Sequence, residues 1–455
     1  MSDSPSSSPA FAPFDATKPH MTSPRLRPVR GFGAKAQDAE GREHDVLGIS
    51  DARQISEKAV MTMPAAQMIL PLLDGTRTVD QIVTEVGRGL TRPILEQLVA
   101  QLDDACLLEG PTFEAHYAKI KADFDASPIL PPASTAAFAE SLLERNEDGS
   151  PKEELPIAPE VQADRLGQLF DAWIAHTLKD VENPAFETLP KAIVAPHLDY
   201  PRGWLNYASV YGRLRVVDRP DRIIVLGTNH FGQSTGICAC DKGYSTILGV
   251  CEGDKDVIDA LRLKLGNTLF ENRFDHEREH SIELQIPWIQ HVFGKDDKGQ
   301  FPKVVGILVH DPAVNNGASY DGKGVDLQPF VDALKAIIAS LPGKTLIVAS
   351  ADLSHVGPAF GDEHPVNGEE EKAAALRQKV FEHDREMLAL LTQNKPWDVV
   401  ASMAWQQNPT RWCSTGNLVA TLLVTEAKEV KLLNHSATVD PNGMAMVSST
   451  SMVVN

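Results

Sequence analysis

The chain has 455 residues, 42% of them hydrophobic and 23% charged, so it is long enough for two or three globular domains with buried cores. Its formal net charge of −19 repels phosphate backbones, and it has no basic patch interleaved with aromatic residues, so we expect no nucleic-acid binding. No apolar run approaches the ~20 residues of a membrane-spanning helix, and five cysteines do not suit a disulfide framework. We therefore expect a cytoplasmic protein that does not bind membranes, and the oligomeric state stays open.

Residues 1–42 are predicted to form a disordered tail. They are rich in Ser, Pro and Ala, and such a segment buries too little apolar surface to offset the entropy lost on ordering.

Residues 43–115 are predicted to form a small helical domain. An apolar stretch over 65–73 ends at a turn signal, and Thr78 then starts a helix with apolar residues at helical spacing. A second helix is expected from near Thr91, with Pro93 in its first turn. This order is typical of a winged helix, and the phrases LLDGTRTVDQIV and LVAQLDDACLLEG resemble PqqD-like peptide-recognition domains. A plain helical packing module fits the pattern equally well.

Residues 116–185 are interpreted as a linker that contains helices. From residue 186 to residue 455, short β-branched apolar runs alternate with helical stretches. The expected strands are 193–195, 223–227, 304–309 and 346–350, and the expected helices include 257–265, 282–293 and 330–341. Continuous apolar strands of this kind indicate a sheet covered on both faces, and therefore an α/β domain.

Histidines follow all four predicted strands, at positions 197, 230, 310 and 355. A single histidine after a strand is usually a loop or surface residue. Four of them are harder to dismiss, because ligands of open α/β sheets bind beyond the carboxyl ends of the strands. One antiparallel strand would move its loop to the opposite edge.

Two further segments combine a histidine with a carboxylate. In HEREHSIELQ, His280 and Glu283 share one helical face and can line a pocket; alternatively Ser281 caps a helix and Glu283 is solvated. In SADLSH, Asp352 can orient His355 or pair with it in proton transfer; alternatively the aspartate caps a turn beside an exposed histidine.

The cysteines suggest one candidate metal ligand. The spacing of Cys238, Cys240 and Cys251 favours packing over a zinc site. Cys413 instead precedes a small-residue turn that leads into an apolar helix, where the helix dipole stabilises a thiolate. Thiolate is the form that binds metals.

Six segments together resemble the Memo-like protein family, which includes protein B of the AmmeMemoRadiSam system. In chain order they are APHLDYPRGW, VLGTNHFG, STILG, EHSIELQIPW, SADLSHVG and WCSTGN. The resemblance implies a central mixed sheet flanked by helices, similar to class III extradiol dioxygenases. It also implies metal binding by His197, His230 and Cys413, with candidate catalytic residues close by at Asp352, His355, His280 and Glu283.

The chain departs from the family pattern beside each expected ligand. Leu198-Asp199 stands where relatives have Ala-Gly, a single His230 stands where they often have two histidines, and Ser414-Thr415 replaces Gly-Arg. We therefore expect the substrate-facing surface to differ. His310 has no counterpart in the pattern and is left out of the ligand set.

Two imidazoles and one thiolate leave coordination positions open for a substrate, water or dioxygen. Iron oxygenases usually use two histidines and a carboxylate, and exchanging the carboxylate for thiolate makes copper or zinc more competitive. The first hypothesis is a dioxygenase-like oxidoreductase with iron as the preferred cofactor and copper or zinc as alternatives. The rivals are a non-catalytic adaptor that binds a small molecule or peptide, and a zinc hydrolase with Glu283 or His355 as base.

Overall fold

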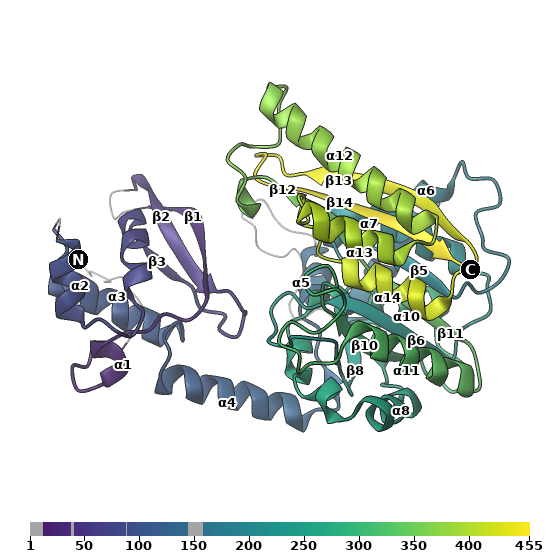
Figure 1. Cartoon of the computed structure of the whole chain (residues 1–455), viewed down its shortest axis with the longest axis horizontal. Helices are drawn as coiled ribbons and strands as arrows, with labels where there is room; N and C mark the ends of the chain where they lie inside the picture. Colours follow the sequence, from purple (N-terminus) through teal and green to yellow (C-terminus); the bar gives the residue numbers. More distant parts are fainter. Residues whose placement is uncertain (1–11, 38–40, 88, 144–157) are drawn as a thin grey trace. The chain divides into compact units, whose positions relative to one another are not determined.

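The computed structural model describes residues 12–37, 41–87, 89–143 and 158–455 (Figure 1). The chain divides into two compact units, Met1–Ala126 and Ser127–Asn455. No helix in the described ranges is both long and apolar enough to cross a bilayer.

The first unit combines an antiparallel sheet with helices. The sheet has the order β1-β2-β3, and its strands are β1 (Val29–Gln37), β2 (Glu43–Asp51) and β3 (Val60–Thr62). The helices are α1 (Pro19–Thr22), α2 (Val79–Val86), α3 (Arg92–Asp104) and α4 (Pro111–Ala126). Thr78 is the predicted N-cap of α2: its hydroxyl accepts from the Gln81 amide, and the Gln81 side chain accepts from the Thr78 amide. Ile49, Ile82, Leu95 and Leu102 belong to its buried core.

The predicted tail is folded over residues 19–37, where the prediction of disorder is wrong. Met21 is buried in the core of the first unit, and β1 pairs with β2 along its whole length. Most β1 side chains are exposed, so backbone hydrogen bonds hold the strand without an apolar pattern that the sequence could reveal. Residues 1–11 lie outside the described residues.

The second unit contains the expected mixed sheet, which has eight strands. Its order is β12-β14-β5-β11-β6-β10-β7, and β13 pairs with β14. The four predicted strands are confirmed and lie parallel at its centre: β5 (Ala192–Ala195), β11 (Thr345–Ser350), β6 (Arg222–Thr228) and β10 (Lys303–Val309). Because they are parallel, the loops after them meet at one edge of the sheet.

The remaining strands of this sheet are antiparallel to their neighbours and have weaker sequence signals. They are β7 (Cys238–Ala239), β12 (Asp352–Val356), β13 (Val430–Val439) and β14 (Met446–Val454). Every residue of β14 is buried, although Ser448–Ser451 are all polar. Hydroxyl hydrogen bonds make this burial tolerable: Ser449 accepts from the Asn206 amide and Ser448 donates to Asp384.

Helices cover both faces of the sheet (Figure 1). One layer contains α8 (Lys255–Leu265), α11 (Leu327–Ser340), α12 (Glu371–Thr392), α13 (Pro396–Gln406) and α14 (Thr415–Thr425). The other contains α6 (Pro159–Leu178), α7 (Tyr200–Tyr211), α9 (His280–Glu283) and α10 (Ile286–Phe293). The single helix predicted over 282–293 is divided into α9 and α10, because Pro287 in the first turn of α10 cannot continue a preceding helix.

The predicted linker is partly built into the second unit. It contains α5 (Ser134–Ser141) and β4 (Ile129–Leu130), which adds a parallel strand to β8 (Gly243–Thr246); β8 in turn pairs with β9 (Gly249–Cys251). The boundary between the units therefore lies after Ala126, earlier than the expected boundary at residue 185.

Candidate metal centre

The loops after β5 and β6 and the turn before α14 bring three potential metal donors together. His197, His230 and Cys413 each offer one donor atom, and these three atoms lie within 4.8 Å of one another. The parallel arrangement explains the two histidines, because β5 and β6 end at the same edge of the sheet. Cys413 comes from a segment much later in the chain, the turn just before α14.

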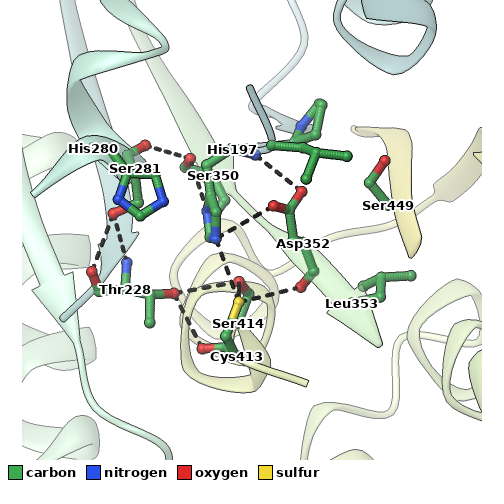
Figure 2. Close-up of polar contacts among 12 residues, drawn as sticks. His197, Thr228, His280, Ser281, Ser350, Asp352, Leu353, Cys413, Ser414 and Ser449 are labelled. Atoms are coloured by element: carbon green, nitrogen blue, oxygen red, sulfur yellow. Dashed lines mark hydrogen bonds and ion pairs between the residues drawn. The ribbon is translucent and has the colours of Figure 1, made fainter. Parts of the chain in front are cut away.

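His197 is 2% exposed and is fixed by polar contacts with its neighbours (Figure 2). Its backbone N–H donates to Asp352 Oδ1 (3.1 Å), and its Nδ1 lies 3.1 Å from the Ser350 carbonyl oxygen. Nδ1 must carry the proton to donate to a carbonyl, so Nε2 has the free lone pair. Nε2 lies 3.3 Å from Cys413 Sγ. Burial and the neighbouring histidines hold the pKa of His197 well below its ordinary value, so this ring is neutral.

His230 is held in a similar way by a carboxylate, Glu279. The His230 backbone N–H donates to Glu279 Oε2 (2.8 Å), and Nδ1 donates to Oε1 (3.0 Å). The other ring nitrogen is therefore the one that faces Cys413. Burial lowers the pKa of His230, but Glu279 and Cys413 outweigh burial and raise this pKa well above its ordinary value. Conversely, burial would raise the pKa of Glu279, but the positive charge of His230 holds it at about 2.

Glu279 was not predicted from the sequence, although it lies in the segment that was singled out. Helical-face reasoning selected Glu283, three residues after His280, and passed over the carboxylate directly before that histidine. Glu279 precedes the first turn of α9 and accepts from the Ser281 amide at 2.8 Å. A carboxylate at such an N-cap position is the local signal that could have identified it.

His280 lies beside the two ligand candidates, as expected. Its ring centre is 4.7 Å from that of His230 and 5.6 Å from that of His197, and its side chain is 28% exposed. His230, Glu279 and His280 form a second group of close donor atoms. Since Glu279 already accepts from three N–H groups, we describe it as a hydrogen-bond partner of His230 and not as a ligand.

Asp352 and His355 both lie near the centre, but they do not form the expected pair. Asp352 is 2% exposed, and its carboxyl contacts His197, with Oδ2 3.7 Å from Nε2. Burial raises the pKa of Asp352 to about 7. His355 Nδ1 lies 2.9 Å from the Leu353 carbonyl oxygen, and burial lowers the pKa of His355 to about 4. Asp352 thus orients His197, whereas backbone carbonyls orient His355.

Glu283 has a different role from the one expected. Its carboxylate accepts four hydrogen bonds from residues 133–135, including 2.7 Å from the Ala133 amide and 2.6 Å from the Thr135 hydroxyl. These are the free donors at the start of α5, so Glu283 caps that helix from a distance. Both of its oxygens are engaged there, and it is not among the donors grouped around His230.

Two other sets of residues lie outside the candidate centre. Cys238, Cys240 and Cys251 are buried, which agrees with a packing role. His310 is 5% exposed, and its ring packs edge-on against Tyr320.

The donor set fits a metal ion. With bond lengths of about 2.3 Å to sulfur and 2.05 Å to nitrogen, tetrahedral ligands lie about 3.5 Å apart. The observed 3.3 Å between His197 Nε2 and Cys413 Sγ is close to this value. Because the Nδ1 atom of each imidazole is engaged elsewhere, the other ring nitrogen is the one left to bind a metal; it is unprotonated in His197, and in His230 a metal would displace its proton.

Comparison with known proteins agrees with this fold. The Memo-like protein family model matches residues 162–453. A MEMO1 family protein of Thermus thermophilus is 25% identical over 266 residues, which are 58% of this chain and 72% of the relative. One from Caldivirga maquilingensis is 24% identical over 256 residues, 55% of this chain and 78% of the relative. One from Methanopyrus kandleri is 29% identical over 172 residues, 38% of this chain and 55% of the relative. The chain therefore belongs to the Memo-like protein family.

Proposed function

We propose that the second unit is a metal-dependent oxidoreductase, dioxygenase-like in chemistry, whose metal is bound by His197, His230 and Cys413. Iron is the preferred metal, and copper or zinc are alternatives. The observation that carries the proposal is the convergence of two imidazole nitrogens and one sulfur within 4.8 Å of one another. In each imidazole Nδ1 is engaged by an oxygen acceptor, which leaves the other ring nitrogen to bind the metal once His230 has given up its proton.

The chemistry that such a metal supplies is one-electron redox and activation of a bound oxygen species, since three protein donors leave coordination positions open. The surrounding side chains have separate tasks. Asp352, whose Oδ2 lies 3.7 Å from His197 Nε2, can hold or release a proton there. His280 is the most exposed of the three clustered imidazoles, so it is placed to contact a substrate.

Metal content tests the proposal. Protein purified without added metal should contain stoichiometric iron or copper, and Cys413→Ser should lose most of it. Anaerobic loading with Fe(II) followed by oxygen-uptake assays with phenols then tests turnover. A protein that binds no redox-active metal under any of these conditions would contradict the proposal.

A zinc-dependent hydrolase is a weaker alternative. Its proposed base Glu283 is engaged in capping α5, which leaves only His355, whose pKa of about 4 makes it a weak base. Stoichiometric zinc together with hydrolytic activity that survives iron removal would favour it.

An adaptor role is favoured by one feature of the first unit. A groove of about 360 Å³ lies along β3 and α3, lined by apolar residues that include Met61, Met63, Met68 and Ile94. These four side chains are 45–66% exposed, and β3 is an edge strand whose backbone can pair with an added strand. We propose an extended apolar peptide as the occupant. Binding of such a peptide by the full chain, and its loss in Met61→Asp, would support this role independently of the metal.

A further inference from the structure

The loop that carries Cys413 has an unusual backbone. Gln407, Asn408 and Arg411 have φ angles of 57°, 46° and 59°, a region that residues other than glycine seldom adopt. Such conformations persist only where surrounding contacts hold them. The contacts that hold this loop therefore also determine where the sulfur of Cys413 lies.

Trp412 is firmly held within this loop. It is 2% exposed, and its backbone exchanges two hydrogen bonds with the Asn408 side chain, both 2.7 Å long. Its indole Nε1–H donates to Asp384 Oδ1 at 2.7 Å and lies 3.1 Å from Ser354 Oγ. Cys413 is the next residue, so this anchor lies directly beside the sulfur donor.

Asp384 lies on α12 and is fully buried. Its Oδ1 accepts from Trp412 and from the Ser354 hydroxyl (2.5 Å). Its Oδ2 accepts from the Ser448 hydroxyl (2.5 Å) and from His435 Nε2 (2.9 Å). A buried carboxylate is costly unless its oxygens are satisfied in this way. The four donors come from the Cys413 loop, β12, β14 and β13, so one side chain joins four separate segments.

Ser354 extends the connection to the second group of site residues. It lies on β12 between Asp352 and His355, and its backbone N–H donates to Ser448 Oγ at 2.9 Å. Its neighbour His355 donates its own backbone N–H to the Thr410 carbonyl, in the same loop as Cys413. The carboxylate of Asp384 thus lies behind both the sulfur donor and the strand that supplies Asp352.

We propose that Asp384 is a positioning residue for the metal centre. Through Trp412 it fixes Cys413 Sγ opposite His197, and through Ser354 it fixes β12 against the same loop. The metal-binding part rests on the proposed function, but the placement of Cys413 does not depend on a metal. This role could not be predicted from the sequence, since Asp384 lies in the polar helical segment FEHDREM.

Alkylation of the metal-free protein tests the placement. Cys413 is partly exposed and the other four cysteines are buried, so iodoacetamide should label Cys413 first, followed by mass spectrometry. Asp384→Asn and Trp412→Phe, which removes the indole N–H together with the five-membered part of the ring, should each change the labelling rate severalfold. The matched control is Asp254→Asn, since Asp254 is also buried and hydrogen-bonded, to Arg222 and the start of α8. Its labelling rate should equal that of the wild type.

Cobalt binding tests the consequence for the metal. Anaerobic Co(II) titration of the wild type should give a thiolate-to-cobalt charge-transfer band in the near ultraviolet. Asp384→Asn and Trp412→Phe should weaken cobalt binding by about 10–100-fold and alter the band, whereas Asp254→Asn should not. If the wild type gives no band, the proposed function fails, while the alkylation rates still decide the positioning role. If Asp384→Asn does not fold, Trp412→Phe carries the test. A folded Trp412→Phe or Asp384→Asn with wild-type labelling and cobalt affinity overturns the proposal.

Discussion

Asp352→Asn should stabilise the metal-free protein, and the gain should grow with pH. In the folded state burial raises the pKa of Asp352 to about 7, whereas an exposed aspartate has a value near 3.8. Between these two values the folded protein holds a proton that the unfolded chain has lost. Stability therefore falls as pH rises through this window, and the loss is complete above about pH 7. Asparagine has the same shape, can accept from the His197 amide and does not ionise.

The size of the effect follows from the pKa difference. A shift of about 3 units corresponds to at most about 4 kcal/mol, since each unit is worth about 1.4 kcal/mol. About 2–3 kcal/mol of this should appear between pH 5 and pH 8 as a growing difference between variant and wild type. The contact between Asp352 and His197 does not offset it, because the His197 ring is neutral in the absence of a cation.

Urea unfolding with a chelator present measures this difference. All six tryptophans lie at or beyond residue 173, so their fluorescence reports on the second unit alone. Asp199→Asn serves as the control, because Asp199 is an exposed carboxylate only two residues from His197. A stability difference between Asp352→Asn and wild type that stays constant from pH 5 to pH 8 would refute the reasoning.

Three other substitutions separate the roles assigned above. Glu283→Ala removes the acceptor of four hydrogen bonds at the start of α5, so it should lower the free energy of unfolding in urea by about 3 kcal/mol and leave cobalt affinity unchanged. A loss of cobalt binding without a loss of stability would restore the catalytic interpretation of Glu283. Glu279→Gln should weaken Fe(II) and Zn(II) binding by about 10–100-fold in competition titrations, and Cu(I) binding by less; equal losses would contradict the charge argument given below. Thr78→Ala should destabilise the first unit by about 1 kcal/mol, seen as faster hydrogen exchange in α2, and unchanged exchange would mean that the capping box contributes nothing.

The central fold was predictable because its strands are continuous apolar runs. The strands β5, β6, β10 and β11 are buried on both faces of a parallel sheet, so their sequences contain almost no polar residues. The strand β14 is equally buried but contains the sequence SSTS, in which the hydroxyls of Ser448 and Ser449 find their partners only in the folded structure. The strand β1 was not predicted for the opposite reason: most of its side chains are exposed, so its sequence has no apolar pattern.

The donors of the candidate centre were predictable, but their hydrogen-bond partners were not. His197, His230 and Cys413 come from short segments whose residue types already suggest metal chemistry. Glu279 and Glu283 lie four residues apart in one such segment, and the sequence alone does not tell them apart. Only the fold places Glu279 against His230 and Glu283 against the start of α5. Asp384 was even harder to predict from the sequence, since it contacts Trp412 and none of the three metal donors directly.

The charges around the centre favour a divalent metal over a monovalent one. A Cys413 thiolate and the Glu279 carboxylate together contribute two negative charges, and Glu279 is buried with His230 as its nearest positive partner. When a cation occupies the ring nitrogen that faces Cys413, His230 can no longer carry a proton there, so the cation must balance both charges. A divalent ion does so completely, whereas Cu(I) leaves one negative charge in a buried site, where uncompensated charge is costly. Thiolate softness favours copper, but the carboxylate behind His230 favours Fe(II) or Zn(II), so Glu279 is the residue whose removal should shift the preference toward copper.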